Sequence, residues 1–201
     1  MTPFEILQSD PRDNRCRRLH AEHPDCLCEQ DSGAPESPGP VLNDEAVVRI
    51  IYAQQFWDEV NCVVKPAAFS EVDTCGMSVT RLNHVSDDML RKQVQDRVEA
   101  KPNRTFIKLV RATKADINSI EFENRRAFCC YDTPNAGNPA HADICQAHPP
   151  DRKSIRAGMR RKLQQQFIDH NWTPKAKTLG EPGGSAATGE GSDMQSNVAP
   201  G

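Results

Sequence analysis

Residues 46–53 (AVVRIIYA) decide the fold, because they form the longest run of β-branched residues in the middle of the chain. Such a run favours an extended backbone and predicts a first strand. Arg49 is the only charged residue within it.

Further strands and helices follow on the C-terminal side of this strand. Ser86 is placed as an N-cap, and Thr113 could cap a shorter helix. The predicted strands are residues 62–69, 76–82, 105–112 and 125–132, with residues 62–69 an edge or bulged strand because of Pro66. The predicted helices are residues 87–100, a short one at 113–120, and 152–168.

About five strands and two or three helices in this mixed order predict a single small α+β domain with a mainly antiparallel sheet. The domain should span residues 41–172. Residues 1–40 form an acidic segment that contains Cys and His and ends in a Gly- and Pro-rich linker. Residues 173–201 are expected to be a disordered tail, because their composition offers little apolar surface to bury.

Charge is distributed unevenly along the chain. Residues 1–45 carry a net charge of −6, residues 46–150 are neutral, and residues 151–177 carry +6. The basic stretch could meet an anionic partner or the acidic N-terminal segment. No apolar run is long enough for a membrane span, and the first residues lack the pattern of an export signal. These features predict a cytoplasmic protein with no membrane partner, whose eight cysteines are reduced.

The N-terminal sequence CRRLHAEHPDCLC concentrates potential zinc ligands. Zinc takes four thiolate or imidazole donors in a tetrahedron, so this cluster could hold one ion. The spacing matches no standard zinc finger, and a flexible arm with reduced thiols is the alternative. The candidate ligands are Cys16, His20, His23, Cys26 and Cys28.

A second cluster, NPAHADICQAH, holds His141, Asp143, Cys145 and His148. His141 with Asp143 offers a general base and a nearby carboxylate. The same four groups could bind a metal. Two structural alternatives remain: a loop stabilised by His141, or a short strand with Ala142 and Ile144 in the core.

Polar residues inside apolar strands are a third candidate site. Arg49, Ser78 and Arg81 lie in the predicted strands, and His84 follows them. A buried guanidinium needs a partner and can grip phosphate or carboxylate with two parallel hydrogen bonds. Arg49 and Arg81 could therefore line an anion site. An internal salt bridge or an exposed sheet face explains them equally well.

The last predicted helix has a basic face formed by Lys153, Arg156 and Arg160. Such a face could follow a phosphate backbone, so nucleic acid is one candidate partner. A solvated surface is the alternative.

The motif order from residue 45 to residue 144 resembles a widespread group of uncharacterised bacterial proteins. The matching pieces are VVRII, KPAAF, GMSVTRL, KADINSI and NPAHADI. The resemblance implies that these segments belong to one domain, and it carries no activity. A weaker similarity, to folds that transfer ADP-ribose, concerns only Arg49 and Ser78.

Three functions are therefore open. The chain is expected to be a binding or regulatory module for an anionic partner, a nucleotide or nucleic acid. The first alternative is an enzyme directed at nucleotides or phosphodiesters, with His141 as acid or base and Arg49 or Arg81 as the clamp. The second is an interaction protein that binds a protein partner and whose N-terminal segment is ordered by zinc.

Overall fold

The computed structural model describes residues 1–9, 14–24, 26–31, 34–101, 104–148, 150 and 152–172. The predicted disordered tail, residues 173–201, lies outside the described residues. No described helix is both long and apolar enough to cross a membrane.

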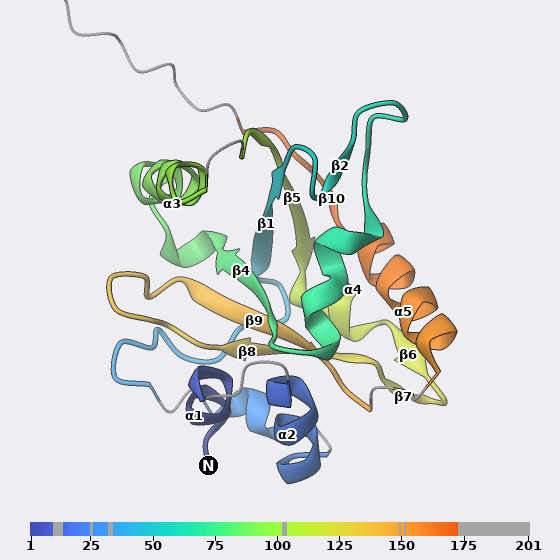
Figure 1. The fold of residues 1–201 in the computed structure, drawn as a ribbon. Helices are drawn as coiled ribbons and strands as arrows, with labels where there is room; N and C mark the ends of the chain where they lie inside the picture. Colours follow the sequence, from blue (N-terminus) through green and yellow to red (C-terminus); the bar gives the residue numbers. More distant parts are fainter. Residues whose placement is uncertain are drawn as a thin grey trace, which may run out of the picture.

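A six-stranded sheet forms the centre of the domain (Figure 1). All of its neighbouring strands pair antiparallel, which confirms the predicted α+β class. In spatial order the strands are β10 (Ile168–His170), β5 (Phe106–Thr113), β1 (Ala46–Tyr52), β4 (Met77–Arg81), β9 (His141–Gln146) and β8 (Phe128–Asp132). The β-branched run at residues 46–53 thus forms an inner strand, and its residues from Val47 to Tyr52 are all buried.

Two helices cover opposite sides of this sheet, α3 (Asp87–Glu99) and α5 (Lys153–Gln166) (Figure 1). The Ser86 side chain accepts a hydrogen bond from the Met89 N–H, so the predicted N-cap of α3 is confirmed. Thr113 likewise caps α4 (Lys114–Asn118). Each helix turns a short apolar stripe toward the sheet.

Pro66 does not lie in a strand, contrary to the prediction for residues 62–69. Only β3 (Val63–Val64) is extended, paired with β2 (Trp57–Asp58), and Pro66–Asp73 forms a 3₁₀ helix, η3. A proline at the first helical position loses no hydrogen bond, and its fixed φ suits a helix.

Two other predicted elements have different bounds. The strand expected at residues 125–132 is divided into β7 (Arg125–Arg126), paired with β6 (Glu121–Phe122), and β8. The last helix ends at Gln166, after which β10 adds an edge strand beside β5. A short 3₁₀ turn, η4 (Leu82–His84), follows β4.

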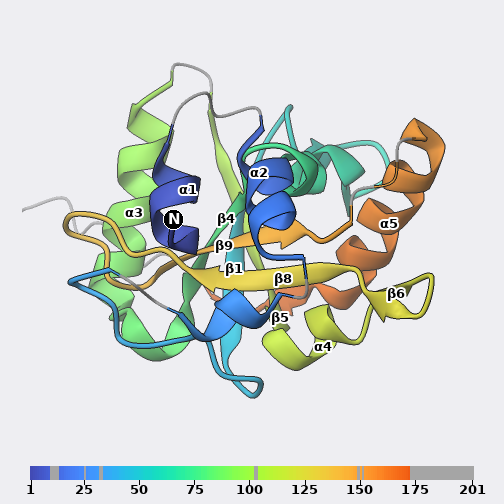
Figure 2. The same ribbon diagram turned by 90° about the horizontal axis from the view of Figure 1, so that it is seen from below.

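The N-terminal segment packs on the sheet instead of forming a free arm. It contains α1 (Pro3–Gln8), α2 (Arg15–Glu22) and the 3₁₀ helix η2 (Leu27–Gln30). Figure 2 shows α1 and α2 on one side of β8 and α4 on the other. Ile6, Leu7 and Leu19 are buried there in a second apolar cluster, against Tyr131 and Ala147.

Glu29 fastens this segment to the edge of the sheet. Its Oε1 accepts the Cys130 N–H at 2.5 Å, a donor on the open side of β8. Its Oε2 lies 3.2 Å from Lys114 Nζ and 3.0 Å from an Arg126 nitrogen. The contact satisfies a strand edge that would otherwise attract other chains.

Arg81 connects the linker to two strands from a fully buried position. Its Nε and Nη2 donate to the two oxygens of Glu45, at 2.7 and 2.8 Å. Its Nη1 donates to Asp132 Oδ1 at 2.6 Å and to the Gly39 carbonyl at 2.7 Å. The internal salt bridge, one of the alternatives for this residue, is therefore what the structure contains.

The two carboxylates respond differently to this burial. Burial alone would raise the pKa of Glu45, but hydrogen bonds from Arg81 and Leu42 outweigh it and hold that pKa below its usual value. Burial dominates at Asp132 and raises its pKa, despite the same guanidinium. Glu45 is therefore the more firmly ionised partner of Arg81.

Arg81→Met should lower the free energy of unfolding by about 3–5 kcal/mol, because it leaves two buried carboxylates without their cation. Lys92→Met is the matched control, since Lys92 forms an exposed pair with Asp96. It should cost about 0.5 kcal/mol or less. Urea unfolding of both variants measures the difference, and equal losses would contradict the central role of Arg81.

Candidate functional site

The register of β4 and β9 brings together three of the predicted catalytic residues. Ser78 lies opposite Asp143, and Thr80 lies opposite His141. Thr133, at the end of β8, completes the group, although sequence reasoning did not single it out. The Asp143 carboxylate accepts from Thr133 Oγ1 at 2.9 Å and from Ser78 Oγ at 3.3 Å.

The hydrogen bonds of this group fix the orientation of the His141 ring. Nδ1 lies 2.7 Å from the Thr133 carbonyl oxygen, which can only accept, so Nδ1 carries the proton. The Thr133 hydroxyl then donates to Asp143, and Nε2 keeps the free lone pair. The nearest atoms of the His141 and Asp143 side chains are 3.9 Å apart, and Thr133 is hydrogen-bonded to both residues. Both side chains are more than nine-tenths buried, which limits access to the base.

The predicted arginine clamps lie on the other face of the sheet. Arg81 pairs with Val47, and Arg49 is two residues further along β1, so the two arginines share a face. His141 pairs with Thr80, the neighbour of Arg81, and therefore points to the opposite face. The structure thus does not bring the clamps and the base together.

Both guanidinium groups are already engaged. Arg49 donates to the Ser78 carbonyl at 2.8 Å and to Glu71 at 2.7 Å, and it stacks over the Phe56 ring. Arg81 is held as described above. His84 Nε2 lies 3.2 Å from Arg81 Nη2 and 3.5 Å from Glu45, so it belongs to the same internal network.

The five predicted zinc ligands have separate partners. No group of three or more metal-binding side chains occurs within the residues that the structure describes. Zinc therefore stays a prediction. Cys26 is bonded to Cys129, Cys16 contacts Cys145, His20 contacts His148, Cys28 contacts the Tyr131 hydroxyl, and His23 contacts the Met1 carbonyl.

The Cys26–Cys129 disulfide corrects the prediction that all cysteines are reduced. Cys129 and Cys130 are adjacent in the sequence. In a strand, however, neighbouring side chains point to opposite faces, so Cys129 meets the N-terminal segment while Cys130 points away from it.

The basic face of α5 is partly used inside the protein. Arg156 lies 3.3 Å from Asp73 and donates to the Pro150 carbonyl at 2.9 Å. Lys153 is exposed. Arg160 borders a shallow hollow between α5 and η3.

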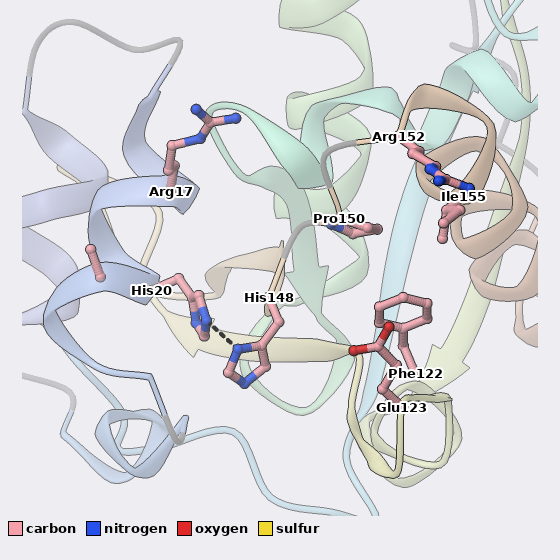
Figure 3. A pocket seen from close by; sticks show the side chains of 9 residues that line it. Arg17, His20, Phe122, Glu123, His148, Pro150, Arg152 and Ile155 are labelled. Atoms are coloured by element: carbon pink, nitrogen blue, oxygen red, sulfur yellow. Dashed lines mark hydrogen bonds between the residues drawn. The ribbon is translucent and has the colours of Figure 1, made fainter.

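A larger hollow, which sequence reasoning missed, lies between α2, the β6–β7 turn and the start of α5 (Figure 3). Its volume is about 790 Å³. We call it the α2–α5 pocket. It is lined by Arg17, His20, Ala21, Phe122, Glu123, His148, Pro150, Arg152 and Ile155.

The lining of the α2–α5 pocket combines two arginines and two histidines with one carboxylate and four apolar residues. Arg17 and Arg152 lie on opposite sides of it (Figure 3), and neither side chain has a hydrogen-bond or ion-pair partner among the described residues. His20 Nε2 lies 2.6 Å from His148 Nδ1, so the two rings share one proton. His148 has a left-handed backbone with φ of 46°, an uncommon conformation that directs its ring toward α2. In the sequence, the basic lining residues of α2 lie more than 100 positions away from His148 and Arg152. No local sequence pattern therefore predicts that they share a pocket.

Thr133→Val should destabilise the protein by about 1–3 kcal/mol, because Asp143 loses one of two buried donors while the shape is preserved. The Thr133 carbonyl remains, so the His141 ring should keep its orientation. Ser119→Ala is the control, since Ser119 is exposed and donates only to the Asp116 carbonyl. Thermal unfolding compares the two variants, and an unchanged midpoint for Thr133→Val would mean that Asp143 is solvated.

Comparisons with known proteins give no match for this chain, whether with family models, curated proteins or solved structures. The assignment of a function therefore depends on the geometry of the chain's own residues.

Proposed function

We propose that the protein is a binding module for a small phosphorylated ligand, in particular a nucleotide, which occupies the α2–α5 pocket. The observation that carries the proposal is the pair Arg17 and Arg152, which line one hollow from α2 and from the residue before α5 and have no ion-pair partner among the described residues. Guanidinium groups bind phosphate through two parallel hydrogen bonds.

The remaining lining residues suit the other parts of a nucleotide. The half-buried Phe122 ring offers a face on which a base would stack. The Glu123 carboxylate would accept hydrogen bonds from sugar hydroxyls. The His20–His148 pair would add a donor to the phosphate.

Nucleic acid is the extended form of the same proposal. Basic residues continue from Arg152 into α5, with the exposed Lys153 next to it and the partly exposed Arg160 two turns further on. A strand whose phosphate sits in the α2–α5 pocket would follow this face. Its binding would depend steeply on salt, because each phosphate contact releases counterions.

The enzyme alternative has less support. His141 has the orientation of a general base, but Arg49 and Arg81 are occupied by Glu71, Glu45 and Asp132. A reaction at His141 would need a cationic group from elsewhere.

Several further expectations remain proposals. They are the relation to the bacterial group, a protein partner, zinc as a cofactor of the N-terminal segment, and a location in the cytoplasm. In that compartment the Cys26–Cys129 bond would be exposed to reductants, where disulfides are usually transient or redox-sensing.

Arg17→Gln with Arg152→Gln should weaken the binding of ADP at low salt by about 10–100-fold, because each arginine supplies a charge-assisted contact. Isothermal titration calorimetry measures the affinity. The matched control, Arg161→Gln with Lys162→Gln, removes the same charge from exposed positions of α5 outside the pocket. It should retain affinity within about threefold, as expected for screened distant charges.

Equal losses in the two double variants would contradict a specific pocket, and so would a lack of ADP binding at low salt. Binding of a short single-stranded oligonucleotide distinguishes the extended form. Its affinity should fall with salt with a slope of about −0.7 per contacted phosphate. Lys153→Gln with Arg160→Gln should then flatten that slope while leaving ADP binding intact.

A further inference from the structure

Two pairs of cysteines join the N-terminal segment to the same two strands. Cys26 is bonded to Cys129 of β8. Cys16 of α2 has its Sγ 2.7 Å from Sγ of Cys145 on β9, both as free thiols. Cys129 and Cys145 lie directly opposite each other in the sheet, so the two pairs are neighbours.

We propose that Cys16 and Cys145 form a second, reversible disulfide that latches α2 onto the sheet. A disulfide bond is about 2.05 Å long, so the two sulfurs need only a small further approach. The neighbouring pair is already bonded between the same two parts of the chain, the N-terminal segment and the edge of the sheet.

The surroundings make the latch depend on the docking of α2. Cys16 has no exposed surface and Cys145 very little, and both lie among the apolar side chains Ile6, Leu7 and Leu19. Burial raises the pKa of the Cys145 thiol, which keeps it protonated and unreactive while α2 is in place. Thiol–disulfide exchange at this pair therefore requires α2 to move away from the sheet. Once α2 has docked again, the disulfide bond keeps it in place.

The reaction needs a disulfide-containing oxidant such as oxidised glutathione. The thiolate of one cysteine attacks a sulfur of the oxidant and releases one reduced thiol. The second cysteine then attacks the mixed disulfide and releases the other thiol. Two S–H bonds of the protein are replaced by one S–S bond, and both protons pass to the two released thiol molecules.

The latch has a direct consequence for the α2–α5 pocket, and this part rests on the proposed function. Cys16 precedes Arg17 and lies one helical turn before His20, while Cys145 lies three residues before His148. The bond would join the two elements that carry these lining residues. Oxidation should then hold the pocket together, and reduction should loosen it.

Thiol counting and peptide mapping test the latch. The chain has eight cysteines, of which six are free beside the existing disulfide. After oxidation with oxidised glutathione, four alkylatable thiols should remain in the unfolded protein, and mapping should find Cys16 linked to Cys145. Trypsin should cut after Arg15, Arg17 and Arg18 at least tenfold more slowly in the oxidised form. The Cys62→Ala control, at an exposed position, should show the same linkage and protection.

A variant with Cys26→Ala and Cys129→Ala isolates the second bond. Its melting temperature should rise by roughly 5–10 °C on oxidation, as expected for one long-range disulfide in a domain of this size. Cys16→Ala with Cys145→Ala should abolish the linkage and the protection from trypsin. If the variant with Cys26→Ala and Cys129→Ala does not fold, peptide mapping of the oxidised wild-type chain still shows whether Cys16 and Cys145 are linked.

The latch is refuted if Cys16 and Cys145 remain free after oxidation, or if the linked protein is cut as fast as the reduced one. About one zinc per chain that Cys16→Ala with Cys145→Ala removes would also refute it, since these thiols would then be metal ligands. ADP affinity, measured in both redox states, reports separately on the pocket. If ADP binds in neither state while the linkage and protection are found, the proposed ligand fails and the latch stands.

Discussion

The buried guanidinium of Arg81 imposes the constraint on which the rest of the fold depends. A buried cation must be neutralised and fully hydrogen-bonded, or it destabilises the protein. Glu45 comes from the segment before β1, Asp132 from the end of β8, and Gly39 from the linker. The hydrogen bonds of Arg81 therefore fix the positions of the linker, the segment before β1 and the end of β8 relative to β4.

The position of Asp132 has consequences for the neighbouring strands. Because side chains alternate along β8, the placement of Asp132 toward Arg81 directs Tyr131 and Cys129 to the opposite face. That face receives α1 and α2, whose apolar side chains bury Tyr131. The same alternation on β9 places His141, Asp143 and Cys145 on one face, so the polar group around Asp143 and the cysteine pairs adjoin.

Charge in this protein is divided between groups that stabilise the fold and groups that remain available. Arg49, Arg81 and Arg126 are bound to carboxylates inside the domain. Arg17 and Arg152 have no such partner among the described residues, and both line the α2–α5 pocket. The arginines near the strands thus stabilise the fold, whereas the two arginines that line the pocket lie on α2 and just before α5.

The sequence by itself determined the local elements. β-Branched runs located β1, β4 and β5, and Ser86 and Thr113 located the starts of two helices, because strand preference and capping depend on near neighbours along the chain. It also placed His141, Asp143 and Ser78 among the polar residues worth attention. Only the tertiary structure decided that Arg81 meets Glu45 and Asp132, that Cys26 meets Cys129, and that Arg17 and Arg152 line one hollow. Those contacts join residues from about 36 to 135 positions apart, and their geometry follows from strand register and helix docking, which no local pattern encodes.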